Sequence, residues 1–292
     1  MSELKIKKSI EDVSVNFIFG KEQEYLEARY VRRIEDYIVC YVSIKKGCSK
    51  ACKFCHLTTT NQISEEEATL EEILMQAREV KKYYDEEVRG GRQKKARIVH
   101  FNFMARGEPL DSKVMLEQNQ ELFLKMSEIF NDLRPKFNVS TIFPKKLKGR
   151  KLTEIFGLIT PTIYYSLYST NKDFRNEWMP QADNFDNVLQ NLKEYQEDTK
   201  KIVKLHQTLI SGVNDSIEDA INIANKVLEY KLIIEFQIVR YNPYSEEEGK
   251  ESSDEQIEIY LDEIRKLLPN FKVKILNRVG HDVNASCGMF YN

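Results

Sequence analysis

Short runs of β-branched and aromatic residues alternate with amphipathic helical stretches from residue 36 onward, and this alternation limits the possible folds. The expected strands lie near residues 37–44, 97–103, 137–142, 162–167, 202–210 and 232–239. Strands that alternate with helices predict a parallel sheet whose crossover connections are helices. Six such units are fewer than the eight of a closed TIM barrel. We therefore predict an α/β fold, namely an open six-unit (β/α)6 partial TIM barrel.

The stretch before this alternation has a different character. Residues 15–44 predict two or three antiparallel strands with a turn near Gly20. This stretch is too short for an independent domain. We expect residues 1–36 to form an N-terminal β extension that packs on the barrel, and residues 37–292 to form the core.

Three helices have apolar residues at helical spacing and a recognisable end. They are residues 64–84 behind a capping box of Ser64 and Glu67, residues 216–229 behind an Asp215 cap, and residues 254–267 before Pro269.

The composition excludes several classes of protein. With 41% hydrophobic and 31% charged residues, the 292-residue chain is neither disordered nor low in complexity. It has neither the long apolar run of a membrane span nor the features of a secretory signal, so we expect a cytoplasmic protein without a membrane partner. The formal charge of -2 does not indicate a nucleic-acid binder, so such a role would depend on local patches.

The five cysteines are too few and too unevenly spaced for a disulfide framework. Cys48, Cys52 and Cys55 lie at spacings of four and three on a predicted loop. Three thiolates can bind three irons of a cubane cluster and leave the fourth iron open. The alternative is a structural zinc site that adds His56, although the adjacent Cys55 and His56 would chelate one ion with awkward geometry.

This C-x3-C-x2-C pattern, with an aromatic residue before the last cysteine, resembles the radical S-adenosylmethionine (SAM) superfamily. The resemblance implies a [4Fe-4S] cluster on Cys48, Cys52 and Cys55, with SAM bound at the open iron. Gly107 and Glu108 follow the strand RIVHFNF and are similar to the GEP motif that contacts the methionine amino group of SAM. The end of a barrel strand is where barrel enzymes place ligand-binding groups.

Cys287 lies in the polar run GHDVNASCGM, which favours an accessible thiol on a loop over a small buried residue. This ending resembles the RlmN/Cfr radical-SAM RNA methyltransferases, whose cysteine at this place carries a methyl group. The resemblance implies Cys40 as the thiol that releases the product and Glu27 as the base. Cys40 lies eight residues before Cys48, where the family usually has seven, and a one-residue change in a strand reverses the face unless a bulge absorbs it.

Ser140, Ser166 and Asn242 match family positions that contact SAM, although two of them also suit strand ends and Asn242 before Pro243 suits a turn. The resemblance implies methylation of C2 or C8 of adenosine in ribosomal or transfer RNA, through a methyl-cysteine and a transient disulfide. It also implies a reducing partner such as flavodoxin or ferredoxin.

Two other functions remain open. One is the same radical machinery acting on a different nucleotide or a small molecule, and the other is a non-catalytic, zinc-stabilised RNA-binding module. Only 26 residues precede Glu27, so we expect the N-terminal helical domain of the family to be absent.

Basic residues gather in two predicted loops, residues 89–97 and 145–151. They suit either contacts with RNA phosphates or an ordinary solvated surface.

Overall fold

A computed structural model of the chain describes residues 3–21, 24–147 and 149–292. Within them, ten strands form one sheet in chain order. The strands are β1 (Leu4–Lys8), β2 (Val15–Lys21), β3 (Glu24–Ile34), β4 (Tyr37–Tyr41), β5 (Ile98–Phe103), β6 (Arg134–Thr141), β7 (Thr162–Ser166), β8 (Val203–Gln207), β9 (Ile234–Val239) and β10 (Lys272–Leu276).

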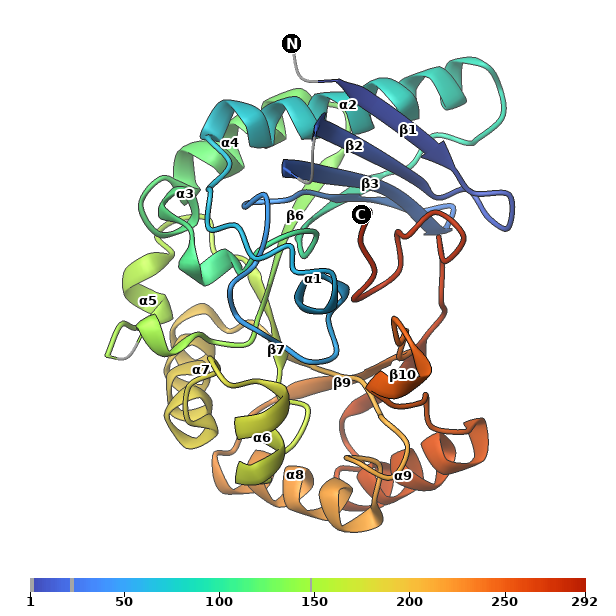
Figure 1. The fold of residues 1–292 in the computed structure, drawn as a ribbon. Helices are drawn as coiled ribbons and strands as arrows, with labels where there is room; N and C mark the ends of the chain where they lie inside the picture. Colours follow the sequence, from blue (N-terminus) through green and yellow to red (C-terminus); the bar gives the residue numbers. More distant parts are fainter. Residues whose placement is uncertain (1–2, 22–23, 148) are drawn as a thin grey trace.

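The sheet has an antiparallel part and a parallel part. Strands β1 to β4 pair antiparallel, and each strand from β4 to β10 pairs parallel with the next. No ladder in the described residues joins β10 to β1, so the barrel is open (Figure 1). The predicted open α/β barrel and the antiparallel strands before it are confirmed. The turn predicted near Gly20 falls next to residues 22–23, which lie outside the described residues.

The parallel part has seven strands, one more than the sequence predicts. The additional strand, β10, has the sequence KVKIL, in which Lys272 and Lys274 interrupt the apolar residues. It pairs with β9 at the edge of the sheet. β1, with the sequence LKIKK, is also rich in lysine and was not predicted. Both strands lie at sheet edges, where charged side chains are common.

The helices flank the sheet on its outer side, except the short α1, which lies at the opening of the barrel (Figure 1). They are α1 (His56–Thr59), α2 (Leu70–Arg89), α3 (Lys113–Glu117), α4 (Asn119–Ile129), α5 (Leu152–Ile155), α6 (Lys172–Trp178), α7 (Phe185–Thr199), α8 (Ile217–Glu229) and α9 (Asp254–Leu267). The predicted helices 216–229 and 254–267 correspond closely to α8 and α9.

Two predicted helix starts are wrong. α2 begins at Leu70, and its capping box consists of Thr69 and Glu72 rather than Ser64 and Glu67. Glu67 instead forms a β-bridge with Lys45, so the preceding backbone runs extended beside the cysteine loop. α8 is capped by Ser216, whose hydroxyl accepts a hydrogen bond from the Asp219 N–H.

Successive side chains of β4 point alternately into the hydrophobic core and toward the interior of the barrel. Ile38 and Cys40 are fully buried in the main hydrophobic core, which also contains residues of α2. Tyr37 and Tyr41, on the opposite face, are only half-buried. Tyr37 packs against His100 of β5 at a ring-centroid distance of 4.8 Å. Because successive strand residues point to opposite faces, Cys40 and Tyr41 have different surroundings.

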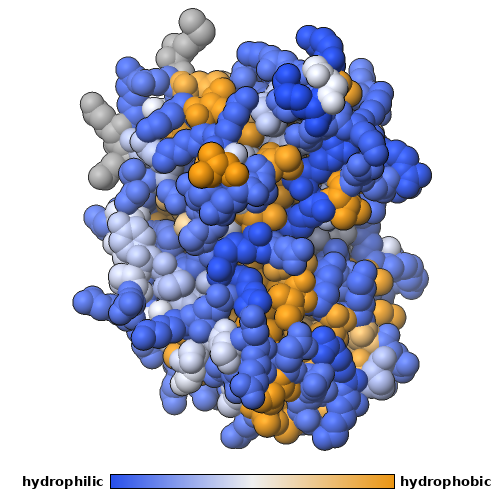
Figure 2. All heavy atoms as spheres, turned by 90° about the vertical axis from the view of Figure 1, so that its right-hand side faces the viewer, coloured by the Kyte–Doolittle hydropathy of each residue, from blue (hydrophilic) through white to orange (hydrophobic). Residues whose placement is uncertain are grey.

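The molecular surface is mainly polar. Figure 2 shows one side of the molecule, where hydrophilic residues predominate and apolar residues form patches between them. Within the described residues, none of the helices combines the length and the apolar character that a bilayer span requires.

Candidate active site

The cysteine loop follows β4 and is held closely against the segment before α2. The backbone N–H of Cys48 donates to the Gln62 carbonyl at 3.0 Å. Gly47 is required there, because a Cβ on it would lie 2.5 Å from the backbone of Gln62 and Ser64. Cys55 caps α1, and its N–H donates to the Cys52 carbonyl at 3.0 Å. The backbone therefore gathers the three predicted ligand thiols in one loop.

Burial makes these three thiols weaker acids than an ordinary cysteine. It raises the pKa of Cys48 to about 11 and that of Cys55 to about 12, and it raises the pKa of Cys52 well above its usual value. Negative charge on Cys48 raises the pKa of the other two further. Lone thiolates are therefore disfavoured, and bound iron would stabilise all three because it binds the deprotonated form.

The donor geometry fits a cluster better than a single zinc ion. In residues 3–21, 24–147 and 149–292, no three Cys, His, Asp or Glu side chains converge on one ion position. His56, the fourth ligand of the zinc alternative, contacts the Asn242 carbonyl through Nε2 at 2.9 Å. In a cubane cluster each cysteine binds a different iron, so the thiols need not converge on one point.

Gly107 and Glu108 lie where β5 ends. Gly107 has a φ of +92°, and a Cβ there would lie 2.8 Å from the Lys45 Cβ. The Glu108 carboxylate accepts hydrogen bonds from the Thr141 hydroxyl at 2.5 Å and the Ile142 N–H at 3.1 Å. Burial nevertheless raises the pKa of Glu108 to about 7. A cationic amino group beside this carboxylate would favour its ionised form.

The other predicted SAM contacts lie at the same ends of the barrel strands. Ser140 and Ser166 are half-buried near the ends of the neighbouring strands β6 and β7. Asn242 follows β9, and its Nδ2 donates to the Cys287 carbonyl at 2.9 Å. Its Oδ1 is buried without a hydrogen-bond partner in the described structure. An unpaired buried acceptor is costly, so Asn242 fits a position that contacts a ligand.

Cys287 is exposed on the C-terminal segment, which crosses the opening of the barrel (Figure 1). The His56 N–H, next to Cys55, donates to the Gly288 carbonyl at 3.0 Å. Burial of its thiol raises the pKa of Cys287, whereas the guanidinium groups of Arg29 and Arg33 act in the opposite direction. The structure thus brings together Cys287 and the cysteine loop, although more than 200 residues separate them in sequence.

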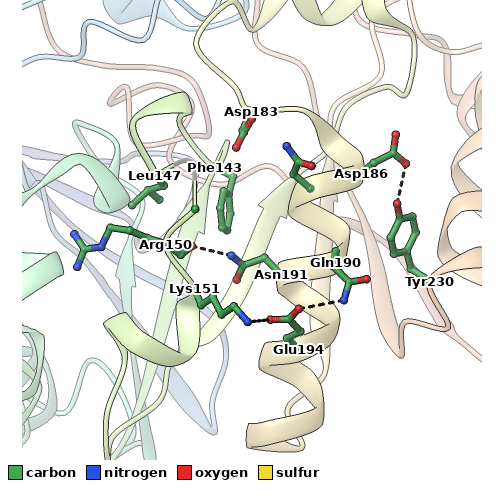
Figure 3. A pocket seen from close by; sticks show the side chains of 12 residues that line it. Phe143, Leu147, Arg150, Lys151, Asp183, Asp186, Gln190, Asn191, Glu194 and Tyr230 are labelled. Atoms are coloured by element: carbon green, nitrogen blue, oxygen red, sulfur yellow. Dashed lines mark hydrogen bonds and ion pairs between the residues drawn. The ribbon is translucent and has the colours of Figure 1, made fainter.

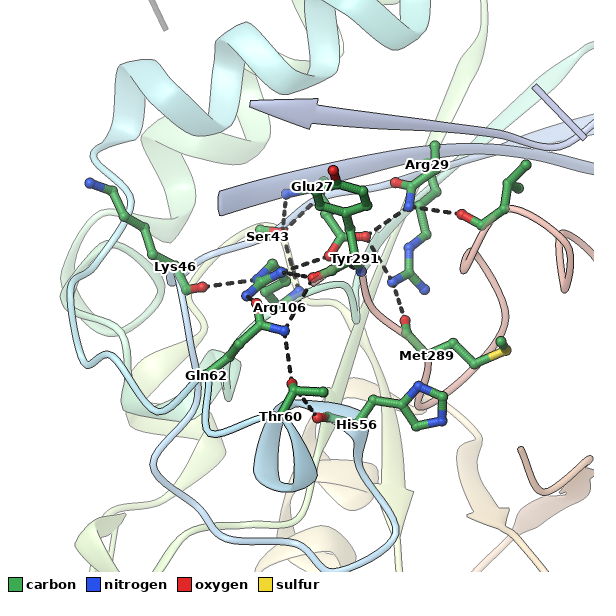
Figure 4. A network of polar contacts seen from close by, with 12 residues as sticks. Glu27, Arg29, Ser43, Lys46, His56, Thr60, Gln62, Arg106, Met289 and Tyr291 are labelled. Atoms are coloured by element: carbon green, nitrogen blue, oxygen red, sulfur yellow. Dashed lines mark hydrogen bonds and ion pairs between the residues drawn. The ribbon is translucent and has the colours of Figure 1, made fainter. Parts of the chain in front are cut away.

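Glu27 is fully buried at the centre of a polar network that holds the C-terminal segment (Figure 4). Its carboxylate accepts four hydrogen bonds: from Asn16 Nδ2 at 2.8 Å, Arg29 Nη2 at 3.3 Å, Arg106 Nη1 at 2.8 Å and the Tyr291 N–H at 3.1 Å. Arg29 also donates to the Met289 carbonyl at 2.6 Å. In this arrangement Glu27 anchors the segment that bears Cys287.

Cys40 is not brought to Cys287. It pairs with Tyr30 on β3 and Phe101 on β5, and its side chain is fully buried in the main core. Burial raises the pKa of its thiol far above the usual value. Tyr41, seven residues before Cys48, lines the recess that contains Cys287. An attack of Cys40 on Cys287 would require a rearrangement of β4.

Two features near the site were not predicted from the sequence. Arg106, directly before Gly107, is fully buried and binds Glu27 and Gln62. Asp111, three residues after Glu108, forms ion pairs with Lys45 at 2.9 Å and Lys50 at 2.6 Å. A single arginine or aspartate beside a motif has no distinguishing pattern in sequence.

The basic loops are largely paired with acidic side chains. Ion pairs join Arg92 to Glu87, Lys94 to Glu35, Lys95 to Asp132, Arg97 to Asp36, Lys146 to Asp111 and Lys151 to Glu194. Lys148 lies outside the described residues. Much of the positive charge in these loops is therefore already balanced within the chain.

A broad surface pocket lies away from the cysteines, between the segment around α5 and helix α7 (Figure 3). Its walls mix charges of both signs, including Lys151 and Glu194, which form an ion pair at 2.9 Å. None of the predicted site residues lines it.

Comparison with known families decides which kind of enzyme this site belongs to. The sequence profile described as "Radical SAM superfamily" matches residues 42–224, which include the cysteine loop, Glu108 and β5 to β8. The chain belongs to the radical SAM superfamily. It is therefore an enzyme, and a [4Fe-4S] cluster and SAM are the cofactors of its family.

Relatives indicate the branch of radical SAM enzymes. A Clostridium beijerinckii protein named "Probable dual-specificity RNA methyltransferase RlmN" is 27% identical over 302 residues, covering 98% of this chain and 76% of that protein. A Synechococcus protein of the same name is 30% identical over 262 residues, covering 86% and 67%. The chain is thus similar to radical SAM methyltransferases of the RlmN type.

A solved structure has the same fold. The radical SAM methyltransferase from Sphaerobacter thermophilus has a TM-score of 0.79 and 19% identity, over 99% of this chain and 80% of that protein. This likeness supports the radical SAM fold of the present chain.

Proposed function

We propose that this radical SAM enzyme methylates C2 or C8 of adenosine in RNA and that Cys287 carries the methyl group. RNA as the substrate comes from the names of the relatives. The observation that carries the proposal is the junction between the C-terminal segment and the cysteine loop. There, the N–H of His56 donates to the Gly288 carbonyl, next to Cys287, at 3.0 Å.

The chain offers candidate binding groups for both cofactors of its family. Cys48, Cys52 and Cys55 would hold the cluster. The predicted SAM contacts are Gly107, Glu108, Ser140, Ser166 and Asn242. When bound, the cluster and SAM supply a methyl group and the one-electron chemistry that activates it.

Cys287 has the properties of a methyl acceptor. It is the exposed residue among the five cysteines, and the thiolate rather than the thiol is the nucleophile. Arg29 and Arg33 favour the thiolate against the effect of the surrounding protein. The polar network around Glu27 keeps the backbone on both sides of Cys287 in place, through Ser286 at 3.1 Å and Met289 at 2.6 Å from Arg29.

The proposed roles of Glu27 and Cys40 both require movement. To remove a ring proton, Glu27 would have to exchange at least one of its four donors for the substrate. The Tyr291 N–H is the uncharged backbone donor among them. For Cys40 to form a transient disulfide with Cys287, its side chain would have to leave the core.

RNA and a reducing protein such as flavodoxin or ferredoxin are the proposed partners, in the cytoplasm. The test compares RNA from cells with the gene, without it, and with Cys287→Ala in its place. Mass spectrometry of nucleosides should find a carbon-methylated adenosine that requires the gene and disappears with Cys287→Ala. Equal methyladenosine levels in the three strains would contradict the proposal.

A further inference from the structure

Beside Cys287 lies a recess whose walls are rich in arginine. We call it the arginine recess, and its lining includes Arg29, Arg33, Arg240, Arg278, His206 and Cys287. Its volume is about 60 Å³, several times the roughly 10–15 Å³ that holds one water molecule. The space suits a small group such as a phosphate and is too small for a whole nucleotide.

Unpaired polar atoms concentrate in this recess. Eight buried side-chain nitrogen or oxygen atoms lack a hydrogen-bond partner within the described residues. Four of the eight belong to residues that line the recess: Arg29 Nε, Arg33 Nε, His206 Nε2 and Asn242 Oδ1. Asn242 belongs to the predicted SAM contacts, but the other three atoms have no such assignment. Buried polar groups are nearly always paired, so these three atoms favour a site for a further ligand. The two arginine atoms are donors, which suits a ligand that accepts hydrogen bonds.

The charges of the recess also favour an anion. Arg240 pairs with Glu251 at 3.4 Å and Asp254 at 2.5 Å, and Arg278 pairs with Glu251 at 2.9 Å. Arg29 shares the carboxylate of Glu27 with Arg106. Four guanidinium groups and no carboxylate line the recess. With Arg106 and the ion-pair partners included, five guanidinium groups are balanced by three carboxylates, which leaves an excess of two positive charges.

Arg33 is the least balanced of these cations. It forms no ion pair with a carboxylate in the part of the chain that the structure describes. The pairing of β3 with β4 shifts register between Val31 and Ile34, and Arg33 lies in this irregular stretch. A bulge commonly re-aims a side chain next to a functional site.

We propose that the arginine recess binds a phosphate group of the substrate, so that the target is presented to Cys287 as a nucleotide held through its phosphate as well as its base. This inference rests on the proposed function and specifies what part of the substrate is recognised. Arginine suits this role because its planar donors match the oxygen atoms of a phosphate.

The test uses the anaerobically reconstituted full chain and measures how fast iodoacetamide alkylates Cys287, quantified by peptide mass spectrometry. The probes are adenosine 5′-monophosphate, adenosine and inorganic phosphate. Each rate with a probe is divided by the rate without it in the same variant, because Arg33 also affects the thiol's acidity. We expect adenosine 5′-monophosphate to slow alkylation about tenfold more than adenosine at the same concentration. Inorganic phosphate should compete with adenosine 5′-monophosphate for the recess.

Arg33→Gln should remove most of this difference. Its matched control is Arg32→Gln, the adjacent residue, whose guanidinium donates to the carbonyl of Ile34 and to Gln93 and which does not line the recess. Equal protection by the nucleotide and the nucleoside in the unmodified chain would overturn the proposal, and this comparison needs no variant. Equal protection in Arg33→Gln and Arg32→Gln would overturn it as well.

Two further readouts separate this inference from the proposed function and from SAM binding. SAM affinity, measured by calorimetry, should be the same in Arg33→Gln and Arg32→Gln, because the predicted SAM contacts do not include Arg33. Selective loss of SAM affinity in Arg33→Gln would assign the recess to SAM and overturn the proposal. If cellular RNA lacks the gene-dependent methyladenosine but inorganic phosphate still slows alkylation of Cys287, the proposed function is contradicted, whereas the proposed phosphate site in the arginine recess is supported.

Discussion

Cys40 and Tyr41 are neighbours in β4, but their side chains lie on opposite faces of the sheet. Cys40 belongs to the core and Tyr41 to the recess beside Cys287. The pairing of β4 with β3 is regular at these two residues, with Tyr30 opposite Cys40 and Arg29 opposite Tyr41. The difference of one residue in spacing from the family is therefore not absorbed by a bulge at this point.

Replacing Cys40 with alanine tests this placement. We expect a stability loss of about 1 kcal/mol from a smaller core side chain, measured by urea unfolding, and unchanged alkylation of Cys287. Cys287→Ala is the control that removes the reactive thiol. Recovery of a covalent protein–RNA adduct from Cys40→Ala would show that Cys40 resolves the intermediate and that β4 rearranges.

Glu108 makes stability depend on pH. Burial raises its pKa to about 7 in the folded chain, against about 4.3 for an unperturbed glutamate. Between these values the folded state binds more protons than the unfolded state, so the stabilisation from this group is present below about pH 4 and is lost as pH rises to about 7. The full change is on the order of 4 kcal/mol.

Glu108→Gln should therefore reduce the fall in unfolding free energy between pH 5 and pH 8. The measurement is urea unfolding of matched cofactor-free preparations at both pH values, and Glu65→Gln serves as an exposed control. An identical pH dependence in Glu108→Gln and the unmodified chain would contradict the assignment. SAM should weaken the dependence, because its amino group would favour the ionised carboxylate.

At the scale of elements, α2 shows why a helix start is hard to locate from sequence. Ser64 with Glu67 and Thr69 with Glu72 both have the capping-box spacing. The choice is made by tertiary structure, because the Lys46 N–H donates to the Glu66 carbonyl and the Ala68 N–H to the Ile44 carbonyl. The backbone before Thr69 is thus occupied by pairing with the cysteine loop.

Thr69→Ala should cost about 1 kcal/mol, because it removes the side-chain acceptor of the Glu72 N–H at the start of α2. Ser64→Ala is the matched control and should cost less than about 0.5 kcal/mol, as is usual for surface changes. Urea unfolding measures both. An equal or larger loss in Ser64→Ala would contradict this helix boundary.

The parallel strands β4 to β9 could be predicted because their apolar runs alternate with amphipathic helices. β1 and β10 could not, because lysines at the sheet edges remove that pattern. The three predicted ligand cysteines and the GEP motif each occupy a short contiguous stretch, so the sequence alone could single them out. Arg33 and Arg106 have no such pattern, because their roles arise from contacts between distant segments.

At the scale of the whole molecule, the C-terminal segment connects parts of the open barrel that the sheet does not join. Its backbone carbonyls accept hydrogen bonds from Arg29 of β3, from Arg106 after β5 and from Asn242 after β9. Arg106 contacts Glu27, Gln62 and the Tyr291 carbonyl together. The C-terminal segment that bears Cys287 is therefore held in place by tertiary contacts rather than by a helix or strand of its own.

Arg106→Met should lower the unfolding free energy by about 3–5 kcal/mol, because it leaves buried Glu27 with fewer partners. Hydrogen exchange should become faster in residues 286–291, while α9 on the far side keeps its protection. Lys266→Met, an exposed helix substitution, is the control. Unchanged exchange in residues 286–291 would contradict the role of Arg106 in holding this segment.

The central claim is that Cys287 receives a methyl group beside the cluster, and one measurement tests it most directly. The reconstituted chain is incubated without oxygen with SAM that carries a deuterated methyl group, digested, and analysed by mass spectrometry. We predict one labelled methyl group on the Cys287 peptide and none on the Cys40 peptide. Absence of label from Cys287 in a chain that binds both cofactors would contradict the account.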